Sequence, residues 1–479
     1  MSIKQQTFTA VRWTSLAMVG KSALQFVQVA ILARLLLPAD FGLMAMVLAV
    51  MVFVQVFTDM GVSNAIIHHQ NISQNQLSSL YWLNVTTAAV LMLVLIAGSE
   101  VIGLLLFQEP ALQPVLAVLS ISILLTAAGQ QLRVMAEKNL HFAVLAKIEV
   151  VAALVGFASA VTWAWMAPSV YALVAGMLVN SAVQTALLWL LAANGWRPAF
   201  RLQFGEIRHF LKFGGFMIVN NFVNSINLQI DILIAGRFFP AAVLGAYSLP
   251  RNLSLTIAGV INPVITRIGF PLMAKAQGDK EFLKAVYLKT MRMTASVNFP
   301  IYIAMAVFSK ECILLVFGER WIHSAPLLVF LSLWGMLRSC GNPVGGLLLA
   351  VGKADLSLKW NIAVLFIVPP SLWFASSWGI SAMAGAQMIL MAVLLMPAWY
   401  FLVQPHCGAG AVEYGLTLLA PLVSALLAVM IGYFAVSAVT VPQWRLFVAA
   451  LVAIPAYLIF SYLLNRQWLV AIRQLVVGR

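Results

Sequence analysis

The chain has 479 residues, of which 63% are hydrophobic and only 9% are charged, and its mean hydropathy is +0.98. A soluble domain carries about a quarter of its residues as charged side chains, so this composition excludes an ordinary soluble protein. The formal net charge of +14 does not require a nucleic-acid partner, because Lys and Arg in a membrane protein first report which side of the membrane a connector occupies.

Apolar stretches long enough to cross about 30 Å of hydrocarbon as a helix recur along the whole chain. We predict an all-α polytopic membrane protein with about fourteen transmembrane helices. The first span is too long for the core of a signal peptide and has no small-residue cleavage site, so we expect it to stay in the membrane. In chain order, the predicted spans are residues 12–37, 42–66, 77–106, 111–135, 143–166, 170–193, 209–236, 243–272, 285–308, 325–350, 358–378, 380–403, 411–437 and 444–464.

Two helical hairpins far apart in the chain have similar sequences. The first reads QFVQVAILARLLLPADFGLMAM (25–46) and the second reads NLQIDILIAGRFFPAAVLGAYS (227–248). Arg34 and Gly42 therefore have the same spacing as Arg237 and Gly245. We interpret this as an internal repeat of two six-helix lobes in the same orientation, related by a pseudo-twofold axis along the membrane normal, with a substrate site between them.

The repeat predicts four segments. They are an N-terminal six-helix lobe (1–193), a cytoplasmic connector (194–212), a C-terminal six-helix lobe (213–403), and two additional transmembrane helices with a cytoplasmic tail (404–479). If both termini lie in the cytoplasm, most Lys and Arg residues of the connectors are cytoplasmic as well, which is the usual bias of membrane proteins. The opposite side then receives few cations, namely Arg34, Arg237, Lys310, Arg320 and Arg445.

Several predicted spans carry polar side chains at helical spacing, so that these side chains share one face. A charge that faces lipid costs at least about 2.5–3.5 kcal/mol, and we therefore expect the polar faces to point together into a wet cavity between the lobes. The polar positions are Lys21, Gln25 and Gln28 in the first span, Gln55 and Asp59 in the second, Asn220, Asn224, Asn227 and Asp231 in the seventh, Arg251, Ser254, Asn262 and Thr266 in the eighth, and Arg338 with Asn342 in the tenth.

The predicted substrate-binding residues are Lys21, Gln25, Asn224, Arg251, Arg338 and Asn342. Arg338 is the main candidate, because a planar guanidinium can contact a phosphate at two points. The alternative is a structural ion pair, or a cap on helix carbonyl groups next to Pro343, which together with nearby glycines makes this helix easy to kink. Asp59 and Asp231 either balance the cations or couple transport to a proton or a sodium ion.

Motifs of nucleotide hydrolases and of hydrolytic enzymes are absent from the sequence. It contains no G-x-x-x-x-G-K-S/T, no H-E-x-x-H and no G-x-S-x-G. Cys312, Cys340 and Cys407 lie in different segments with no paired spacing, which predicts neither a disulfide framework nor a metal site. We expect a protein that is not an enzyme and that has no catalytic residues, no metal and no cofactor.

Four stretches carry a family resemblance: TDMGVSNAIIHHQNIS (58–73), GQQLRVMAEKNLHF (129–142), INPVITRIGFPLMAKAQGD (261–279) and LRSCGNPVGGLLLAVGKADLSLKWN (337–361). They resemble the polysaccharide-transport family of the multidrug/oligosaccharidyl-lipid/polysaccharide exporter superfamily, nearest the colanic-acid type of Wzx exporters. The resemblance covers nearly the whole chain. Within it, Arg338 is the site residue that the matching stretches carry over most directly.

This resemblance implies a MATE-like fold of two lobes that alternates between inward-open and outward-open states. It also implies a flippase of the bacterial inner membrane that moves an undecaprenyl-pyrophosphate-linked oligosaccharide from the cytoplasmic to the periplasmic leaflet. The product would enter exopolysaccharide, capsule or O-antigen (lipopolysaccharide) biosynthesis. The implied partners are this lipid-linked oligosaccharide, membrane lipids, and a polysaccharide polymerase with its chain-length machinery, and none of them is a nucleic acid.

Two alternative functions stay open. A multidrug exporter of the same superfamily would expel organic cations, but such cargo favours carboxylates, and cations outnumber acids among the predicted cavity residues. A membrane polymerase or ligase of the same pathway would need a sizeable periplasmic loop with catalytic groups. The longest polar connector, around 194–212, is predicted to be cytoplasmic.

Overall fold

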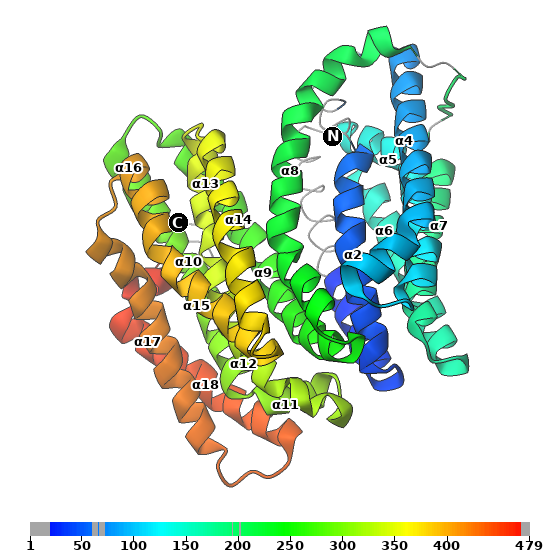
Figure 1. Ribbon diagram of the computed structural model, residues 1–479. Coiled ribbons are helices and arrows are strands. Elements are labelled where there is room, and N and C mark those ends of the chain that lie inside the picture. The colour runs from blue at the N-terminus through cyan, green and yellow to red at the C-terminus, as the bar shows by residue number, and fades with distance from the viewer. Residues whose placement is uncertain (1–19, 60–65, 67–71, 194, 201–202, 471–479) are drawn as a thin grey trace. The chain divides into compact units, whose positions relative to one another are not determined.

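The computed structural model describes residues 20–59, 66, 72–193, 195–200 and 203–470. Helices make up almost all of this part of the chain, which contains no strand (Figure 1). Within it, 11 helices are long and apolar enough to cross a membrane, or 12 if α10 (Lys280–Val307) and α11 (Ser309–Val316) form one bent span. The all-α, membrane-spanning class is therefore confirmed, whereas the number of about fourteen spans stays a prediction.

The chain divides into two compact units, residues 1–245 and 246–479. The first unit contains helix 20–35, α2 (Pro38–Asp59), α4 (Gln74–Val101), the π-helix η1 (Ile102–Phe107), α5 (Leu112–Lys138), α6 (Phe142–Met166), α7 (Val170–Leu191), α8 (Phe204–Phe238) and the start of α9 (Ala241–Lys275). Figure 1 shows α8 as a long, curved helix, and its C-terminal part packs on α2. The lobe boundary that the repeat predicts, at residues 194–212, stays a prediction.

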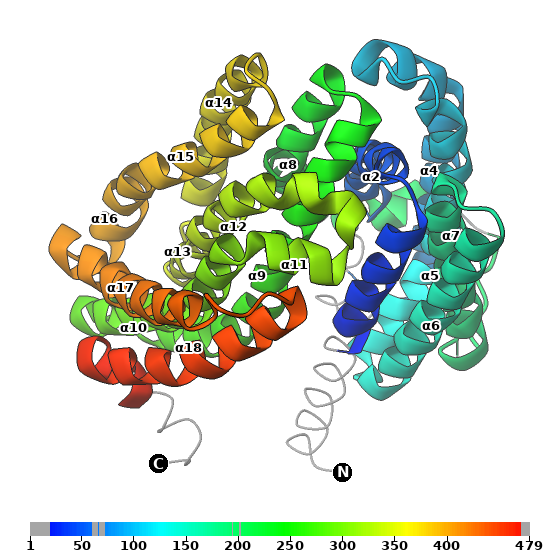
Figure 2. The same ribbon diagram turned by 90° about the horizontal axis from the view of Figure 1, so that it is seen from below.

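The second unit contains the rest of α9, followed by α10 and α11. Its further elements are η2 (Glu319–Ser324), α12 (Ala325–Ser339), α13 (Gly341–Ala350), α14 (Ala354–Ser376), α15 (Ile380–Ala398), η3 (Trp399–Val403), α16 (Gln404–Cys407), α17 (Ala411–Ala435) and α18 (Pro442–Leu464). The last two helices pack side by side, and α17 also packs on α10 (Figures 1 and 2).

Local signals in the sequence explain where helices begin and break. Ser73 starts α4 with a capping box, in which its hydroxyl accepts the Gln76 N–H at 3.2 Å and the Gln76 side chain accepts the Ser73 N–H at 3.0 Å. The chain bends by 86° between α10 and α11. Cys340 separates α12 from α13, and Pro343 lies in the first turn of α13, where its missing N–H is not needed.

The two hairpins of the predicted repeat contact each other through equivalent glycines. A Cβ atom on Gly42 would overlap the backbone of Ala241, and a Cβ atom on Gly245 would overlap the backbone of Pro38. Pro38 and Ala241 occupy equivalent positions in the two hairpins, so the contact is reciprocal, as a twofold relation requires. Glycine is required at both positions because no other residue lets the backbones approach so closely.

Arg34 and Arg237 occupy equivalent helix ends as well. Arg34 is one residue before the end of helix 20–35, and Arg237 is one residue before the end of α8. A cation in the last turn of a helix is favourable, because the unsatisfied carbonyl groups carry partial negative charge there. The two hairpins thus match in the positions of their helix ends and in their reciprocal backbone contacts.

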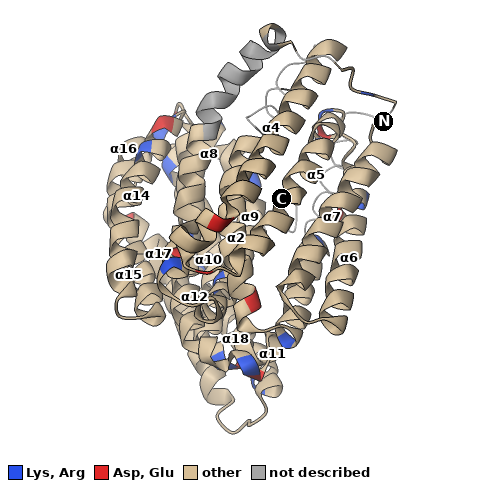
Figure 3. Cartoon of the chain, turned by 45° about the vertical axis from the view of Figure 1, so that its right-hand side comes forward, with Lys and Arg blue, Asp and Glu red and all other residues tan. Residues whose placement is uncertain are grey.

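Charged residues are few along the lengths of the helices, as the mostly tan cartoon of Figure 3 shows. Large apolar side chains are instead exposed on several helices, which suits a surface covered by lipid. Examples are Leu93, Leu105, Trp165, Phe366, Phe401, Phe434, Phe447 and Leu451.

Candidate functional site

Part of the polar face of α9 is used for packing within the second unit. The Asn298 side-chain amide donates a hydrogen bond to Asn262 Oδ1 at 2.9 Å, and the Tyr302 hydroxyl donates to the Ser254 carbonyl oxygen at 2.6 Å. All four residues are buried. Polar side chains commonly join helices in this way within a membrane. Asn262, which the sequence placed on a cavity face, therefore holds α9 against α10 through its side chain. The contact at Ser254 uses only the backbone carbonyl, and the buried Ser254 hydroxyl has no partner among the described residues.

Arg338 lies in the last turn of α12 and is half-buried. Its guanidinium carbon is 5.4 Å from the centroid of the Trp334 ring, one turn earlier on the same helix, which is within the range of a cation–π contact. Asn342 follows one turn later, at the start of α13, and is exposed.

Two charged residues on the predicted polar faces are almost completely buried. Arg251 of α9 is 3% exposed and Asp231 of α8 is 1% exposed. Burying a charge is costly unless polar groups surround it, so both side chains need polar or charged partners.

Lys21 belongs to a charged network in the first unit. Its Nζ is 3.9 Å from one carboxylate oxygen of Glu149, and Arg133 Nη2 is 2.8 Å from the other oxygen. Arg133 Nε also lies 3.1 Å from the Glu137 carboxylate. The network connects helix 20–35, α5 and α6. Glu149 was missed by the sequence analysis, although a carboxylate inside the predicted span 143–166 is itself a signal of function or pairing.

The remaining predicted residues lie on helices of the first unit. Gln25 and Asn224 are exposed. Asp59 is the last residue of α2, but its side chain lies outside the described residues. Lys21, Gln25, Asn224, Asp59 and Asp231 thus belong to one unit. The other three predicted residues, Arg251, Arg338 and Asn342, belong to the second unit, and the common cavity stays a prediction.

Metal and disulfide sites were not expected from the sequence. Among the described residues, no group of three or more His, Cys, Asp and Glu side chains could hold a metal ion. Cys312, Cys340 and Cys407 are free thiols, and the last two are buried.

Comparisons with known proteins assign the chain to a family. The family described as "Polysaccharide biosynthesis protein" matches residues 31–326. The chain is 32% identical over 439 residues to the lipopolysaccharide biosynthesis protein WzxC of Escherichia coli (strain K12). This match covers 90% of this chain and 88% of that protein. The resemblance seen in the sequence is thereby confirmed.

Solved structures share the fold. The lipid II flippase MurJ in an inward closed conformation has a TM-score of 0.76 at 12% identity, covering 96% of this chain and 100% of that chain. An inward-facing multidrug resistance MATE family transporter of the MOP superfamily has a TM-score of 0.60 at 11% identity, covering 81% of this chain and 97% of that chain. The chain therefore has the MATE-like fold of this superfamily, and it belongs to the polysaccharide biosynthesis protein family.

Proposed function

We propose that the chain is an inner-membrane flippase that moves an undecaprenyl-pyrophosphate-linked oligosaccharide from the cytoplasmic to the periplasmic leaflet by alternating access. Membership of the polysaccharide biosynthesis protein family, with a relative matched over 90% of the chain, is the observation that carries this proposal. The flipped unit would then pass to a polymerase with its chain-length machinery, for exopolysaccharide, capsule or O-antigen assembly.

The proposed substrate contacts are Lys21, Gln25, Asn224, Arg251, Arg338 and Asn342. A pyrophosphate that leaves water needs charge-assisted hydrogen bonds, and guanidinium and ammonium groups supply them. Arg338 is the strongest candidate, because it is a half-buried guanidinium in the last turn of α12. Its planar donor fork can bind a two-oxygen acceptor at two points.

The membrane potential supplies a driving force for this proposed step. Moving an anion out of a cell with a negative interior is favoured by about 2.3 kcal/mol per charge per 100 mV. Asp231 would then balance a nearby cation rather than couple transport to an ion. If Asp231→Asn abolishes the dependence of flipping on a proton or sodium gradient but leaves voltage-driven flipping intact, Asp231 is a coupling residue and this assignment is wrong.

Both termini and the connector at 194–212 are proposed to be cytoplasmic, because of the distribution of Lys and Arg. Gly205 is exposed at the start of α8, so Gly205→Cys in a variant without the native cysteines reports the orientation. An impermeant thiol reagent added to intact spheroplasts should fail to label it and should label it after lysis. Rapid labelling of intact spheroplasts would invert the proposed topology.

Deletion of the gene separates this function from its competitors. We expect lipid-linked repeat units to accumulate on the cytoplasmic leaflet, with drug sensitivity unchanged. A multidrug exporter would instead give higher drug sensitivity without such accumulation. Loss of a polymerase or ligase would leave lipid-linked units on the periplasmic leaflet, because flipping would still occur.

A further inference from the structure

A cavity of about 730 Å³ lies in the second unit, and none of the proposed transport residues lines it. Its walls come from α10, α17 and residues 466–470, which follow α18. Leu288, Met293 and Leu416 contribute apolar surface to it. Lys289, Arg292 and Arg466 contribute cationic side chains, so the cavity combines an apolar wall with positive charge.

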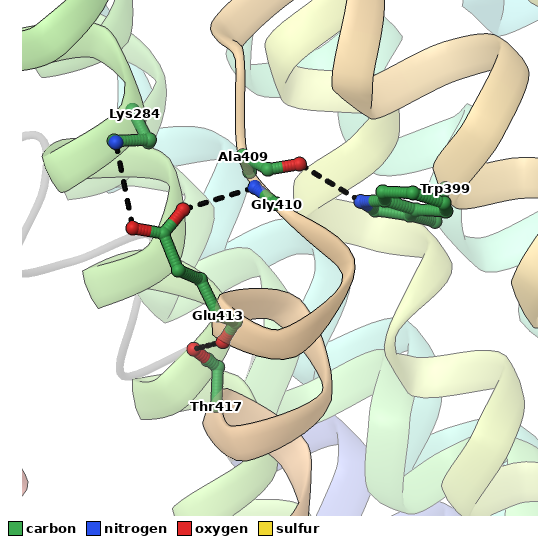
Figure 4. A network of polar contacts seen from close by, with 6 residues as sticks. All are labelled: Lys284, Trp399, Ala409, Gly410, Glu413 and Thr417. Atoms are coloured by element: carbon green, nitrogen blue, oxygen red, sulfur yellow. Dashed lines mark hydrogen bonds and ion pairs between the residues drawn. The ribbon is translucent and has the colours of Figure 1, made fainter.

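The carboxylate at this cavity is already neutralised. Glu413 lies 3.4 Å from Lys284 Nζ, and its other carboxylate oxygen accepts the Gly410 N–H at 2.9 Å (Figure 4). The Glu413 carboxylate also stands at the first turn of α17, where negative charge is favourable. Glu413 therefore pairs with Lys284 and Gly410, and it does not neutralise the cationic side chains that line the cavity.

The cavity cations have no carboxylate partners within the described part of the chain. Arg292 donates a hydrogen bond to the neutral side-chain oxygen of Gln467, and the Arg466 guanidinium lies 5.6 Å from the centroid of the Tyr462 ring. No ion pair joins Lys289, Arg292 or Arg466 to an acid among the residues that the structure describes. Together they attract an anion.

Trp468 forms part of the cavity wall. It is only 7% exposed, and its indole N–H is buried away from the cavity surface. The ring therefore contributes apolar surface beside the cationic side chains.

The segment that carries Trp468 is held firmly on α10. The Asn465 side-chain amide donates to Ser296 Oγ at 2.7 Å, and the Tyr457 hydroxyl donates to the Ser296 carbonyl oxygen at 2.7 Å. The centroids of the Tyr457 and Trp468 rings are 5.6 Å apart. These contacts fix one wall of the cavity in place before any ligand arrives, which lowers the entropic cost of binding.

We propose that this cavity binds the headgroup of an anionic phospholipid. The phosphate would lie among Lys289, Arg292 and Arg466, and the acyl chains would follow the apolar wall, which includes the Trp468 ring. Cationic residues at the cytoplasmic surface are attracted to the anionic lipids of that leaflet. The assignment to the cytoplasmic leaflet depends on the proposed topology, whereas the binding site itself does not depend on the transport function.

Native mass spectrometry of the full chain in detergent tests this proposal. Phosphatidylglycerol and phosphatidylcholine with identical acyl chains are titrated separately. We expect phosphatidylglycerol to bind at least about tenfold more tightly, and Arg292→Gln with Arg466→Gln to weaken it by about tenfold or more without affecting phosphatidylcholine.

The matched control is Lys353→Gln with Lys359→Gln, which removes two exposed cations outside the cavity and should leave phosphatidylglycerol binding unchanged. If the arginine variant loses its folded state, Lys289→Gln with Arg466→Gln replaces it, because Lys289 and Arg466 are both exposed. Equal binding of the two lipids, or unchanged binding in the cavity variants, would overturn the proposal. Complete competition by free glycerol phosphate would also overturn it, since the site would then take a soluble anion.

Discussion

The two repeated hairpins are alike where their backbones meet and different along their polar faces. Gly42 and Gly245 make reciprocal backbone contacts. Farther along, Asp231 of α8 is buried, whereas its counterpart in helix 20–35 is the neutral and only half-buried Gln28. Lys21 likewise corresponds to the uncharged Asn224. The close backbone contact therefore requires the same geometry in both hairpins, whereas the charges on their polar faces differ.

The largest effect is expected at the hairpin contact. Gly42→Ala and Gly245→Ala each place a methyl group into the backbone of the other hairpin, and rotation of a side chain cannot relieve that overlap. We expect each change to lower the free energy of unfolding by more than about 4 kcal/mol, or to abolish folding. Expression level and thermal unfolding of the purified protein measure this.

Gly415→Ala is the matched control, because a Cβ atom at this position of α17 meets open space. It should be neutral or stabilising by up to about 1 kcal/mol. Wild-type stability of both hairpin variants would show that the two hairpins do not touch through these glycines.

A smaller loss is expected in the charged network around Lys21. Glu149→Gln removes the carboxylate that Arg133 contacts at 2.8 Å and Lys21 at 3.9 Å, and should cost about 1–3 kcal/mol because the side chain is largely buried. Lys21→Gln should cost less than about 1 kcal/mol, since Lys21 is 46% exposed and its contact is long. A double-mutant cycle in thermal unfolding measures the coupling.

This pair of variants also sharpens the comparison between the halves. If Lys21 contacts cargo, Lys21→Gln lowers flipping per folded molecule while the folded state stays intact. Should Lys21→Gln destabilise the protein as strongly as Glu149→Gln does, Lys21 is a structural ion-pair partner and its place among the substrate contacts is lost.

A loss no larger than that of Glu149→Gln is expected at the contact between α9 and α10. Asn298→Ala removes the buried hydrogen bond to Asn262 and should lower stability by about 1–2 kcal/mol, with flipping per folded molecule unchanged. Asn342→Ala, at an exposed position, should do the opposite, leaving thermal unfolding unchanged and lowering flipping. Reversed outcomes would exchange the structural and functional roles of these two asparagines.

The fold was largely predictable from the sequence, because it rests on local rules. Hydropathy located the helices, and the spacing of Arg34 and Gly42 against Arg237 and Gly245 revealed the repeated hairpin. Ser73 with Gln76 marks the start of α4 through side chains only three residues apart. Each of these signals depends on residues that are close in sequence or on a spacing that the sequence preserves directly.

The neighbours of each polar face were not predictable in the same way. Helical periodicity shows that Ser254 and Asn262 share a face, but it does not show whether that face meets water or another helix. The structure gives the Asn262 side chain a partner in Asn298, whereas Tyr302 bonds the backbone carbonyl of Ser254 and not its hydroxyl. The cavity at Trp468 was missed for the same reason, since its walls come from α10, α17 and a segment far along the chain.

The most direct test of the proposed function is the rate of flipping of a lipid-linked oligosaccharide per folded molecule in reconstituted vesicles, measured for Arg338→Ala. We predict that this variant unfolds at the wild-type temperature and that its flipping falls roughly ten- to a hundredfold, as expected for the loss of one charge-assisted contact. Arg338→Lys should recover only part of the activity, because an ammonium lacks the planar two-point contact. Lys359→Ala, which removes an exposed cation of α14, should flip normally. Normal flipping by Arg338→Ala would contradict a role for Arg338 in holding the cargo.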